Sequence, residues 1–343
     1  MRRQISQNRG FVGALVLCVG LFVLYNFLHP RGFSSAVFVQ NANESVAIAF
    51  VAMAQTVPVL MRGLDLSVGA VMTLSACVAS YLLNGSALDI TLGVFATLTV
   101  GTVFGLTNGV IVVYGRLQPI IATLATGAIA IGLALLLRPQ PGGDVDGDLG
   151  WALTNTVWDL VDTYGPDGAT EASWLRPIAG IPVPLILLAG VAILVWLPFK
   201  RTVTGRTVYA IGSAEGAAFV SGLPIHRAKL TAFTLAGFFS ACAGLYLALQ
   251  TSTGNADTVQ AGAYTLNSIA AVVLGGTALA GGIGGAIASV VGALILRVIT
   301  FYFRILDIEP LLQPLIEGLV LLLAVSAGAW RAFAVKNRLE LFR

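Results

Sequence analysis

The side chains that could carry chemistry are few and scattered in this sequence. Its two histidines, His29 and His226, are far apart, and its three cysteines, Cys18, Cys77 and Cys242, each lie within an apolar run. Metal sites and disulfide frameworks need such residues at short, regular spacings. We therefore expect neither of them, and no residue of this chain is predicted to be catalytic or to bind a metal.

Six acidic residues lie in or near long apolar stretches: Glu44, Asp65, Asp89, Asp307, Glu309 and Glu317. Most of them fall at the ends of these stretches. A carrier driven by an ion gradient needs ionisable groups near the middle of the membrane, and Arg297 and Glu317 are the main candidates for such a role. An enzyme acting on lipid-soluble substrates would need paired carboxylates or clustered His and Asp, and no such cluster appears in the sequence.

The sequence also lacks the Gly-x4-Gly-Lys-Ser/Thr loop that cradles nucleotide phosphates. We therefore expect this chain to hydrolyse no nucleotide by itself and not to be an enzyme. Transport powered from outside the chain is the function class that remains.

The elements that must position these residues are membrane helices. Of 343 residues, 57% are apolar, only 10% are charged and 39 are glycine, whereas a soluble domain carries about 25% charged residues. A helix needs about 20 mostly apolar residues to cross the bilayer. Ten such segments are predicted: 11–28, 44–61, 68–83, 88–113, 119–137, 182–199, 230–250, 263–280, 286–303 and 310–329. The prediction is an all-α, single transmembrane domain over residues 1–343.

The distribution of basic residues predicts that both termini are cytoplasmic. Ten spans leave only Arg31, Arg138, Arg176 and Arg304 in outside loops, with Arg297 inside a span. The remaining basic residues then lie inside, as the positive-inside rule requires: Arg2, Arg3, Arg9, Arg62, Arg116, Lys200, Arg201, Arg206, Arg227, Lys229, Arg331, Lys336, Arg338 and Arg343. Two pairs of segments are joined by very short turns: 44–61 with 68–83, and 263–280 with 286–303. Either pair could instead form a re-entrant hairpin.

Two connecting segments are long. Residues 138–181 form an acidic outside loop, within which apolar residues from Leu153 to Tyr164 recur at helical spacing. This spacing predicts a helix lying along the outer surface of the membrane. Residues 200–229 form the longest basic stretch between spans and are too polar to enter lipid. We expect them to form a cytoplasmic loop.

Four stretches occur in order along the chain: 63–69 (GLDLSVG), 115–124 (GRLQPIIATL), the basic loop with 209–212 (YAIG) and 215–218 (EGAA), and 269–277 (IAAVVLGGT) with 281–285 (GGIGG). Together they resemble the permease subunit of bacterial ABC importers for monosaccharides, the ribose/xylose/galactose type. The resemblance runs from about residue 40 to residue 330. Most members of that family carry a glycine where this chain has Arg62.

The resemblance implies that loop 200–229 docks onto a separate ATPase. A short helix with Ala214, Ala217, Ala218 and Ser221 on one face could enter a groove of the partner, and Gly222 and Pro224 would end it. The residues assigned to docking are Gly205, Arg206, Glu215, Ala217, Ala218, Gly222 and Pro224. A solvated basic loop is the alternative.

The glycine-rich stretches have two interpretations. Asp65 could accept hydrogen bonds from free amides at the start of the next helix and so cap a tight turn, and Gly275 could permit close helix packing. Alternatively, these turns unwind beside the transport path and act as gates. The residues concerned are Gly63, Asp65, Ser67, Gly69, Gly275 and Gly276.

Polar residues within the spans are candidates for the substrate path, because a sugar needs hydrogen-bonding groups and aromatic faces. They are Gln55, Asn108, Thr123, Tyr264 and Asn267. Each could instead form hydrogen bonds between helices.

The sequence thus predicts a multi-pass permease subunit of the bacterial inner membrane, surrounded by lipid and without a role in nucleic-acid binding. The expected partners are a cytosolic ABC ATPase that binds ATP and Mg²⁺, a periplasmic sugar-binding protein, and a second permease chain, identical or related. The alternatives are an ion-gradient-driven secondary transporter and an ABC permease for a different small polar solute. The sequence does not name the sugar.

Overall fold

The structure is a computed structural model that describes residues 9–309, except 31, 33, 167–168 and 172–173, and scattered residues between 312 and 326. The fold of the described residues is all-helical, and the only β-structure found among them is two isolated bridges. Half of the predicted tenth span, 310–329, lies outside the described residues, as do Arg2, Arg3 and the basic residues from Arg331 onward. The count of ten spans and the cytoplasmic termini remain predictions.

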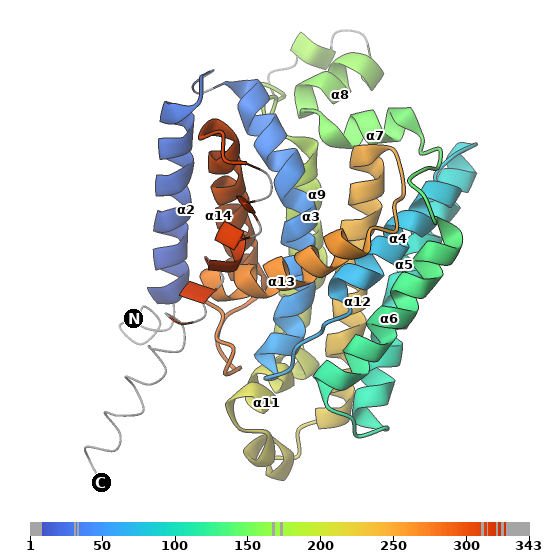
Figure 1. The fold of residues 1–343 in the computed structure, drawn as a ribbon, viewed down its shortest axis with the longest axis vertical. Coiled ribbons are helices and arrows are strands. Elements are labelled where there is room, and N and C mark those ends of the chain that lie inside the picture. Colours follow the sequence, from blue (N-terminus) through green and yellow to red (C-terminus); the bar gives the residue numbers. More distant parts are fainter. Residues whose placement is uncertain are drawn as a thin grey trace.

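The helices form one bundle (Figure 1). In chain order they are α2 (Arg9–Leu28), α3 (Ser35–Leu60), α4 (Val68–Leu82), α5 (Ala87–Val113), α6 (Pro119–Leu137), α7 (Gly147–Thr154), α8 (Val157–Tyr164), a short 3-10 turn (Ala169–Glu171), α9 (Val183–Val191), a π-helical turn (Ala192–Trp196), α10 (Leu197–Arg201), α11 (Val203–Val220), α12 (Ile225–Thr251), α13 (Thr258–Leu274) and α14 (Ala286–Ile305).

Nine of the predicted spans coincide with helices of the described part of the chain. Seven are long and apolar enough to cross a membrane, one of them made of α9, the π-helical turn and α10 together; α4 and α13 are shorter. Four boundaries differ from the prediction by five residues or more: the starts of α3, α12 and α13, and the end of α13. The helix α3 begins nine residues before residue 44, because Ser34 caps it and its polar first turns pack against other helices. The helix α13 ends at Leu274 because Gly275 caps it and Gly276 has a positive φ of 87°.

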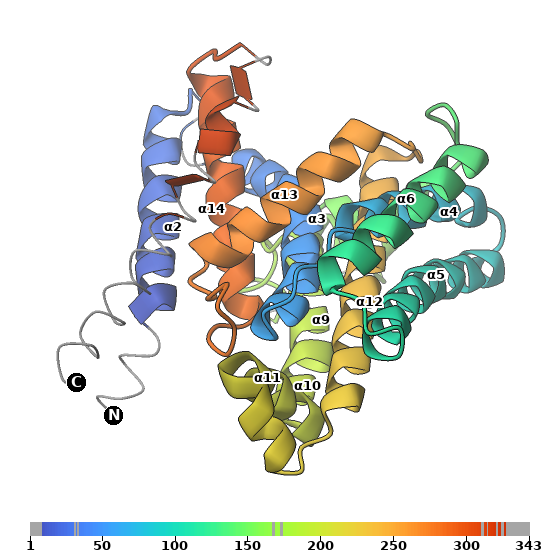
Figure 2. The same ribbon diagram turned by 60° about the horizontal axis from the view of Figure 1, so that its bottom comes forward.

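The core lies around α3. This helix is almost entirely enclosed by α12, α14, α13 and other helices, whereas α5 and α6 lie at the outside (Figures 1 and 2). The outer faces of α5 and α6 carry large apolar side chains such as Phe95 and Leu136, which are 63% and 79% exposed. Such faces are typical of contact with lipid.

The two long connections lie at opposite ends of the bundle (Figure 1). At one end, the helix predicted from Leu153 to Tyr164 in the acidic loop is present as α8, and it is preceded by α7, which was not predicted. The helix α8 begins only at Val157 because Thr156 caps it, forming reciprocal hydrogen bonds with Asp159. At the other end lies α11, which contains most of the basic loop. We call these the α7 end and the α11 end.

Candidate functional site

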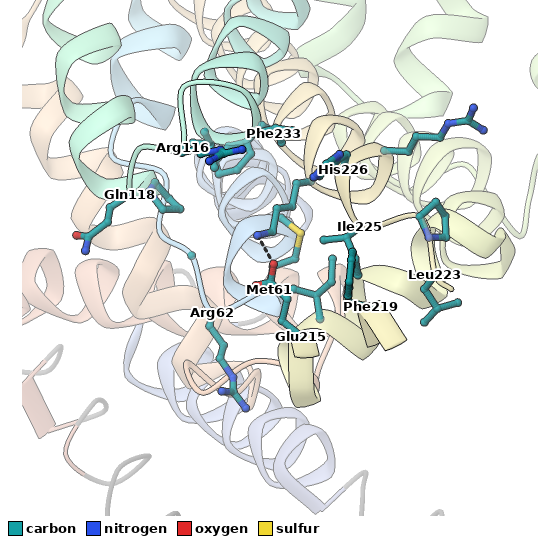
Figure 3. A pocket seen from close by; sticks show the side chains of 18 of the residues that line it. Met61, Arg62, Arg116, Gln118, Glu215, Phe219, Leu223, Ile225, His226 and Phe233 are labelled. Carbon is teal, nitrogen blue, oxygen red and sulfur yellow. Dashed lines mark hydrogen bonds and ion pairs between the residues drawn. The ribbon is translucent and has the colours of Figure 1, made fainter. Parts of the chain in front are cut away.

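A cavity of about 1020 Å³ opens at the α11 end. The turns that follow α3 and α5, the last part of α11 and the start of α12 line it (Figure 3). Its basic lining residues are Arg62, Arg116, His226, Arg227 and Lys229. The three arginines and the lysine were all predicted to lie on the cytoplasmic side, and in the structure they line the same cavity.

The helix α11 consists of two parts. Thr202 caps its start by accepting a hydrogen bond from the Gly205 amide (3.0 Å). Ala214 interrupts it with non-helical angles, φ −162° and ψ 97°. We call residues 203–213 the inner segment and residues 215–220 the outer segment. The outer segment exposes Phe219 and Val220, which are 73% and 85% accessible, beside the cavity.

The residues predicted to dock an ATPase fall into two groups. Arg206, Glu215, Ala217 and Gly222 are exposed, and Pro224 is half-buried just before α12. In contrast, Gly205 and Ala218 are buried within the chain and position the helix rather than forming its outer face. The predicted face of small residues is therefore divided between the protein interior and the surface.

Glu215 is paired within the chain. Its carboxylate accepts a hydrogen bond from the Lys229 ammonium on α12 at 2.5 Å (Figure 3), and the two side chains are 51% and 26% exposed. The ion pair fixes the start of the outer segment against α12. Because both groups are partly solvated, the pair contributes little to stability.

The inner segment is enclosed by backbone atoms. A Cβ atom at Gly212 would lie 1.9 Å from the Leu60 carbonyl oxygen and 2.4 Å from the Gly282 amide nitrogen. The Gly282 amide donates to the Leu60 carbonyl (3.0 Å), and the Tyr209 hydroxyl donates to the Gly284 carbonyl (2.9 Å). The end of α3, the inner segment and the glycine-rich loop 275–285 therefore meet in one junction. Only glycine fits at position 212.

Arg62 also belongs to this junction. The sequence identifies it only as a basic residue in a turn, but its guanidinium donates to carbonyl oxygens of Gly212, Ser213 and Ala280. No pattern in the sequence indicates these contacts, since the three acceptors are backbone atoms more than a hundred residues away.

The turn between α3 and α4 is held by a buried polar network. Asp65 is 2% exposed, and its carboxylate accepts hydrogen bonds from the amide and hydroxyl of Ser67 (2.8 and 2.6 Å). The Asn108 amide donates to the Ser67 hydroxyl (2.8 Å), and the Thr126 hydroxyl donates to the Asn108 carbonyl oxygen (2.5 Å). Burial raises the pKa of the Asp65 carboxyl, and the hydrogen bonds from Ser67 oppose that shift. The turn is thus joined to α5 and α6.

This network unites residues that the sequence assigned to different roles. Asp65 and Ser67 were expected in a turn, and Asn108 on the substrate path. Thr123, another predicted path residue, accepts a hydrogen bond from the Leu66 amide (2.9 Å) at the same turn. Here Asn108 and Thr123 hold helices together.

The predicted turn glycines mark close contacts between segments. Gly63 lies in the turn after α3, beside Pro119. The Gly69 amide donates to the Thr265 hydroxyl of α13 (3.1 Å), so the start of α4 lies against α13. Gly275 and Gly276 end α13 and lead into the junction loop.

Gln55 is a different case among the predicted path residues. It is fully buried in the middle of α3, and neither its amide nitrogen nor its carbonyl oxygen has a hydrogen-bond partner in the described structure. An unpartnered buried polar group costs about 1–3 kcal/mol. Gln55 therefore stays a candidate for the substrate path.

A second polar cluster contains another predicted path residue, Asn267. Asn267 donates to the Glu317 carboxylate (3.3 Å), which also accepts from the Thr300 hydroxyl (3.3 Å). Tyr264 lies on the same helix, α13, and is half-buried. Sequence reasoning indicated Tyr264, Asn267 and Glu317 separately, and the fold brings Asn267 and Glu317 together.

Next to this cluster, Glu44 is the centre of an ion-pair network. Arg304 donates to its carboxylate (2.7 Å), and Arg297 donates to its backbone carbonyl (2.8 Å) with the carboxylate 3.9 Å away. The sequence did not reveal this pairing because the partners are more than 250 residues apart. Both ionisable groups considered for an ion-driven carrier, Arg297 and Glu317, therefore hydrogen-bond to neighbouring helices. Within the described ranges, no group of three or more His, Cys, Asp or Glu side chains is arranged to hold a metal ion.

Comparison with known proteins identifies the family. Residues 37–325 match the family described as "Branched-chain amino acid transport system / permease component". A ribose import permease protein of Haemophilus influenzae is 31% identical over 95% of this chain and 94% of its own length. The ribose import permease protein of Bacillus subtilis is 35% identical over 94% and 92% of the two chains. A D-allose transport system permease protein of Escherichia coli is 28% identical over 92% and 90%. No solved structure matches. The chain therefore belongs to this family of transport permeases, as its four sequence motifs predicted.

Proposed function

We propose that the chain is the permease subunit of an ABC importer and forms the inner-membrane path for a monosaccharide. The proposal rests on the exposed apolar side chains of the outer segment of α11. This segment exposes Phe219 and Val220 beyond the break at Ala214, at the end of the bundle where the basic residues gather. A large apolar side chain beside a wide basic cavity is a surface that fits a protein partner.

The partner at this surface is a cytosolic ATPase. The sequence of this chain contains no phosphate-binding loop, so ATP and Mg²⁺ are bound by the partner and not by this chain. The outer segment, with Glu215, Ala217 and Phe219, and the cavity beside it then form the docking surface. Closure of two ATPase subunits would move the outer segment and, through the junction at Gly212, the turns at the α11 end.

The α7 end then faces the periplasm. Its helices α7 and α8 expose Asp148, Asp162 and Trp158 to solvent. A periplasmic binding protein loaded with sugar would dock there and release its ligand to the path. The path itself forms against a second permease chain, identical or related, in the same membrane.

The substrate proposed is a monosaccharide, because relatives are named for ribose, D-allose and fructose. The polar groups that could hydrogen-bond sugar hydroxyls are Tyr264 and Asn267 of α13 and Glu317, whose carboxylate accepts a hydrogen bond from Asn267. The family description names branched-chain amino acids, so a different small polar solute is the competing substrate class.

The experiment is reconstitution of this chain in proteoliposomes with the ATPase and the binding protein encoded next to it. Uptake of labelled ribose, allose, fructose and leucine is measured with ATP at the ATPase side, without ATP, and with a proton or sodium gradient alone. We expect uptake of one sugar that requires ATP and the binding protein. Uptake driven by the ion gradient in the chain alone would overturn the proposal, and ATP-dependent uptake of leucine alone would overturn the substrate class.

A further inference from the structure

Arg62 occupies an unfavourable position for an arginine. It lies in the turn after α3 with a positive φ of 63°, a left-handed conformation that only glycine adopts at no cost. This conformation ends α3 in a Schellman motif, in which the amides of Arg62 and Gly63 donate to the carbonyl oxygens of Val59 and Pro58. Glycine would serve this motif at lower cost, so what an arginine adds here is its side chain.

The Arg62 side chain joins three parts of the chain. Its Nε donates to the carbonyl oxygens of Gly212 (2.7 Å) and Ala280 (2.8 Å), and its Nη2 donates to the carbonyl oxygen of Ser213 (2.8 Å). The acceptors lie on the inner segment of α11 and on the loop 275–285. A guanidinium presents its donors in a rigid, planar fork, which an ammonium group cannot reproduce.

The position of these acceptors along α11 is informative. Gly212 and Ser213 are the last residues before the break at Ala214. At a helix end the final carbonyls lack partners within the helix, and a cation there is favourable. Arg62 therefore acts as a C-terminal cap for the inner segment, supplied by a different part of the chain.

The turn that carries Arg62 is itself fixed to other helices. Three residues further on, the Asp65 carboxylate accepts hydrogen bonds from Ser67, and the Ser67 hydroxyl accepts one from Asn108 of α5. A continuous set of contacts thus runs from the break in α11, through Arg62, to the start of α4 and to α5.

We infer that Arg62 is a positioning residue that couples movement of the outer segment to the turn between α3 and α4, and thereby ATP hydrolysis to transport. The inference rests on the proposed function. The outer segment then contacts the ATPase, and Arg62 transmits the movement of the outer segment to the turn between α3 and α4. Substitution of Arg62 then uncouples the two activities without preventing docking.

The test uses the complete transporter in proteoliposomes, with three measurements on each variant: co-purification of the ATPase, the rate of ATP hydrolysis, and sugar uptake. Arg62→Gly removes the side chain and relieves the positive φ, so the variant is expected to fold. It should co-purify with the ATPase and hydrolyse ATP, but uptake per ATP hydrolysed should fall by about fivefold or more, as expected for loss of a coupling interaction. Arg62→Lys keeps the charge but loses the fork, and should restore only part of the ratio.

Asp307→Gly is the matched control. Asp307 is an exposed residue of the turn after α14 that also has a positive φ, of 51°, and it lies outside the junction and outside the docking surface. Its substitution should leave the ratio of uptake to hydrolysis unchanged. An unchanged ratio in Arg62→Gly would overturn the inference, and so would loss of ATPase co-purification, which would assign Arg62 to docking. Failure of the wild-type chain to bind an ATPase would instead overturn the proposed function.

Discussion

The inner and outer segments of α11 are adjacent in sequence but differ in how tightly the residues on either side of the break are packed. The inner segment is enclosed by the end of α3 and the loop 275–285, with no room for a side chain at Gly212. The outer segment begins after Ala214 and exposes Phe219 and Val220. A side chain has no room at Gly212 in the first segment and free space at Gly216 in the second. Because a break separates the two segments, one part of the helix can pack rigidly while the other stays exposed to contact a partner.

The strongest test of this difference is a methyl group added to each segment. Gly212→Ala places a Cβ 1.9 Å from the Leu60 carbonyl oxygen, whereas nothing lies within 4 Å of a Cβ at Gly216. Overpacking at a rigid site costs about 3 kcal/mol. Gly212→Ala should therefore lower the melting temperature of the purified protein and its yield, and Gly216→Ala should not. Equal melting temperatures would show that the junction is not rigid.

The second test concerns the exposed apolar side chain. Phe219→Asp should weaken ATPase binding roughly 30-fold, the effect of losing one interface hot spot of about 2 kcal/mol. Because Phe219 is 73% exposed, the melting temperature should stay the same. Binding is measured by titration of the detergent-solubilised permease with the ATPase. Phe219→Leu, which keeps an apolar side chain, serves as the control. Unchanged affinity in Phe219→Asp would remove the outer segment from the docking surface.

A third, smaller effect is expected at the start of the inner segment. Thr202→Ala removes the hydroxyl that accepts the Gly205 amide, and loss of such a cap costs about 1 kcal/mol. Thermal melting should reveal this loss, while the affinity for the ATPase stays within the error of the titration. Thr202→Ser, which retains the hydroxyl, should restore the melting temperature. A large loss of affinity in Thr202→Ala would mean that the two segments are not separable.

The smallest effect is expected for Glu215, which pairs with Lys229 across the start of the outer segment. The charge reversal Glu215→Lys places like charges together and should cost less than about 1 kcal/mol, because the pair is partly solvated. The double variant Glu215→Lys with Lys229→Glu restores an ion pair. If Glu215 acts by positioning the segment, the double variant binds the ATPase as the wild type does. If Glu215 touches the ATPase directly, binding stays impaired.

The sequence predicted the helices well because their signal is local. Long apolar runs identified nine segments that are helical in the structure, and spacing in the acidic loop indicated α8 but not α7. Boundaries were less certain where polar residues begin a helix. Asp257 caps α13 by accepting the amides of Val259 and Gln260, yet the small and polar residues that follow it gave a predicted start at 263.

The contacts within the candidate site could not be predicted because they join distant residues. The break at Ala214 carries no proline to mark it, and the partners of Arg62 are carbonyl oxygens that every residue possesses. In the same way, Glu44 and Arg297 meet only after the chain has folded. The type of a residue indicates the chemistry that it can perform, whereas the fold selects the partner.

The most direct test of whether the outer segment of α11 contacts the ATPase is site-specific cross-linking at Phe219. A photo-reactive phenylalanine analogue is placed at Phe219 and, as a control, at Phe95, which is 63% exposed on the outer face of α5. In the assembled transporter, the analogue at position 219 should cross-link to the ATPase subunit, and the analogue at position 95 should not. The contradicting result is an active complex in which position 219 cross-links to lipid or to nothing while the ATPase remains bound.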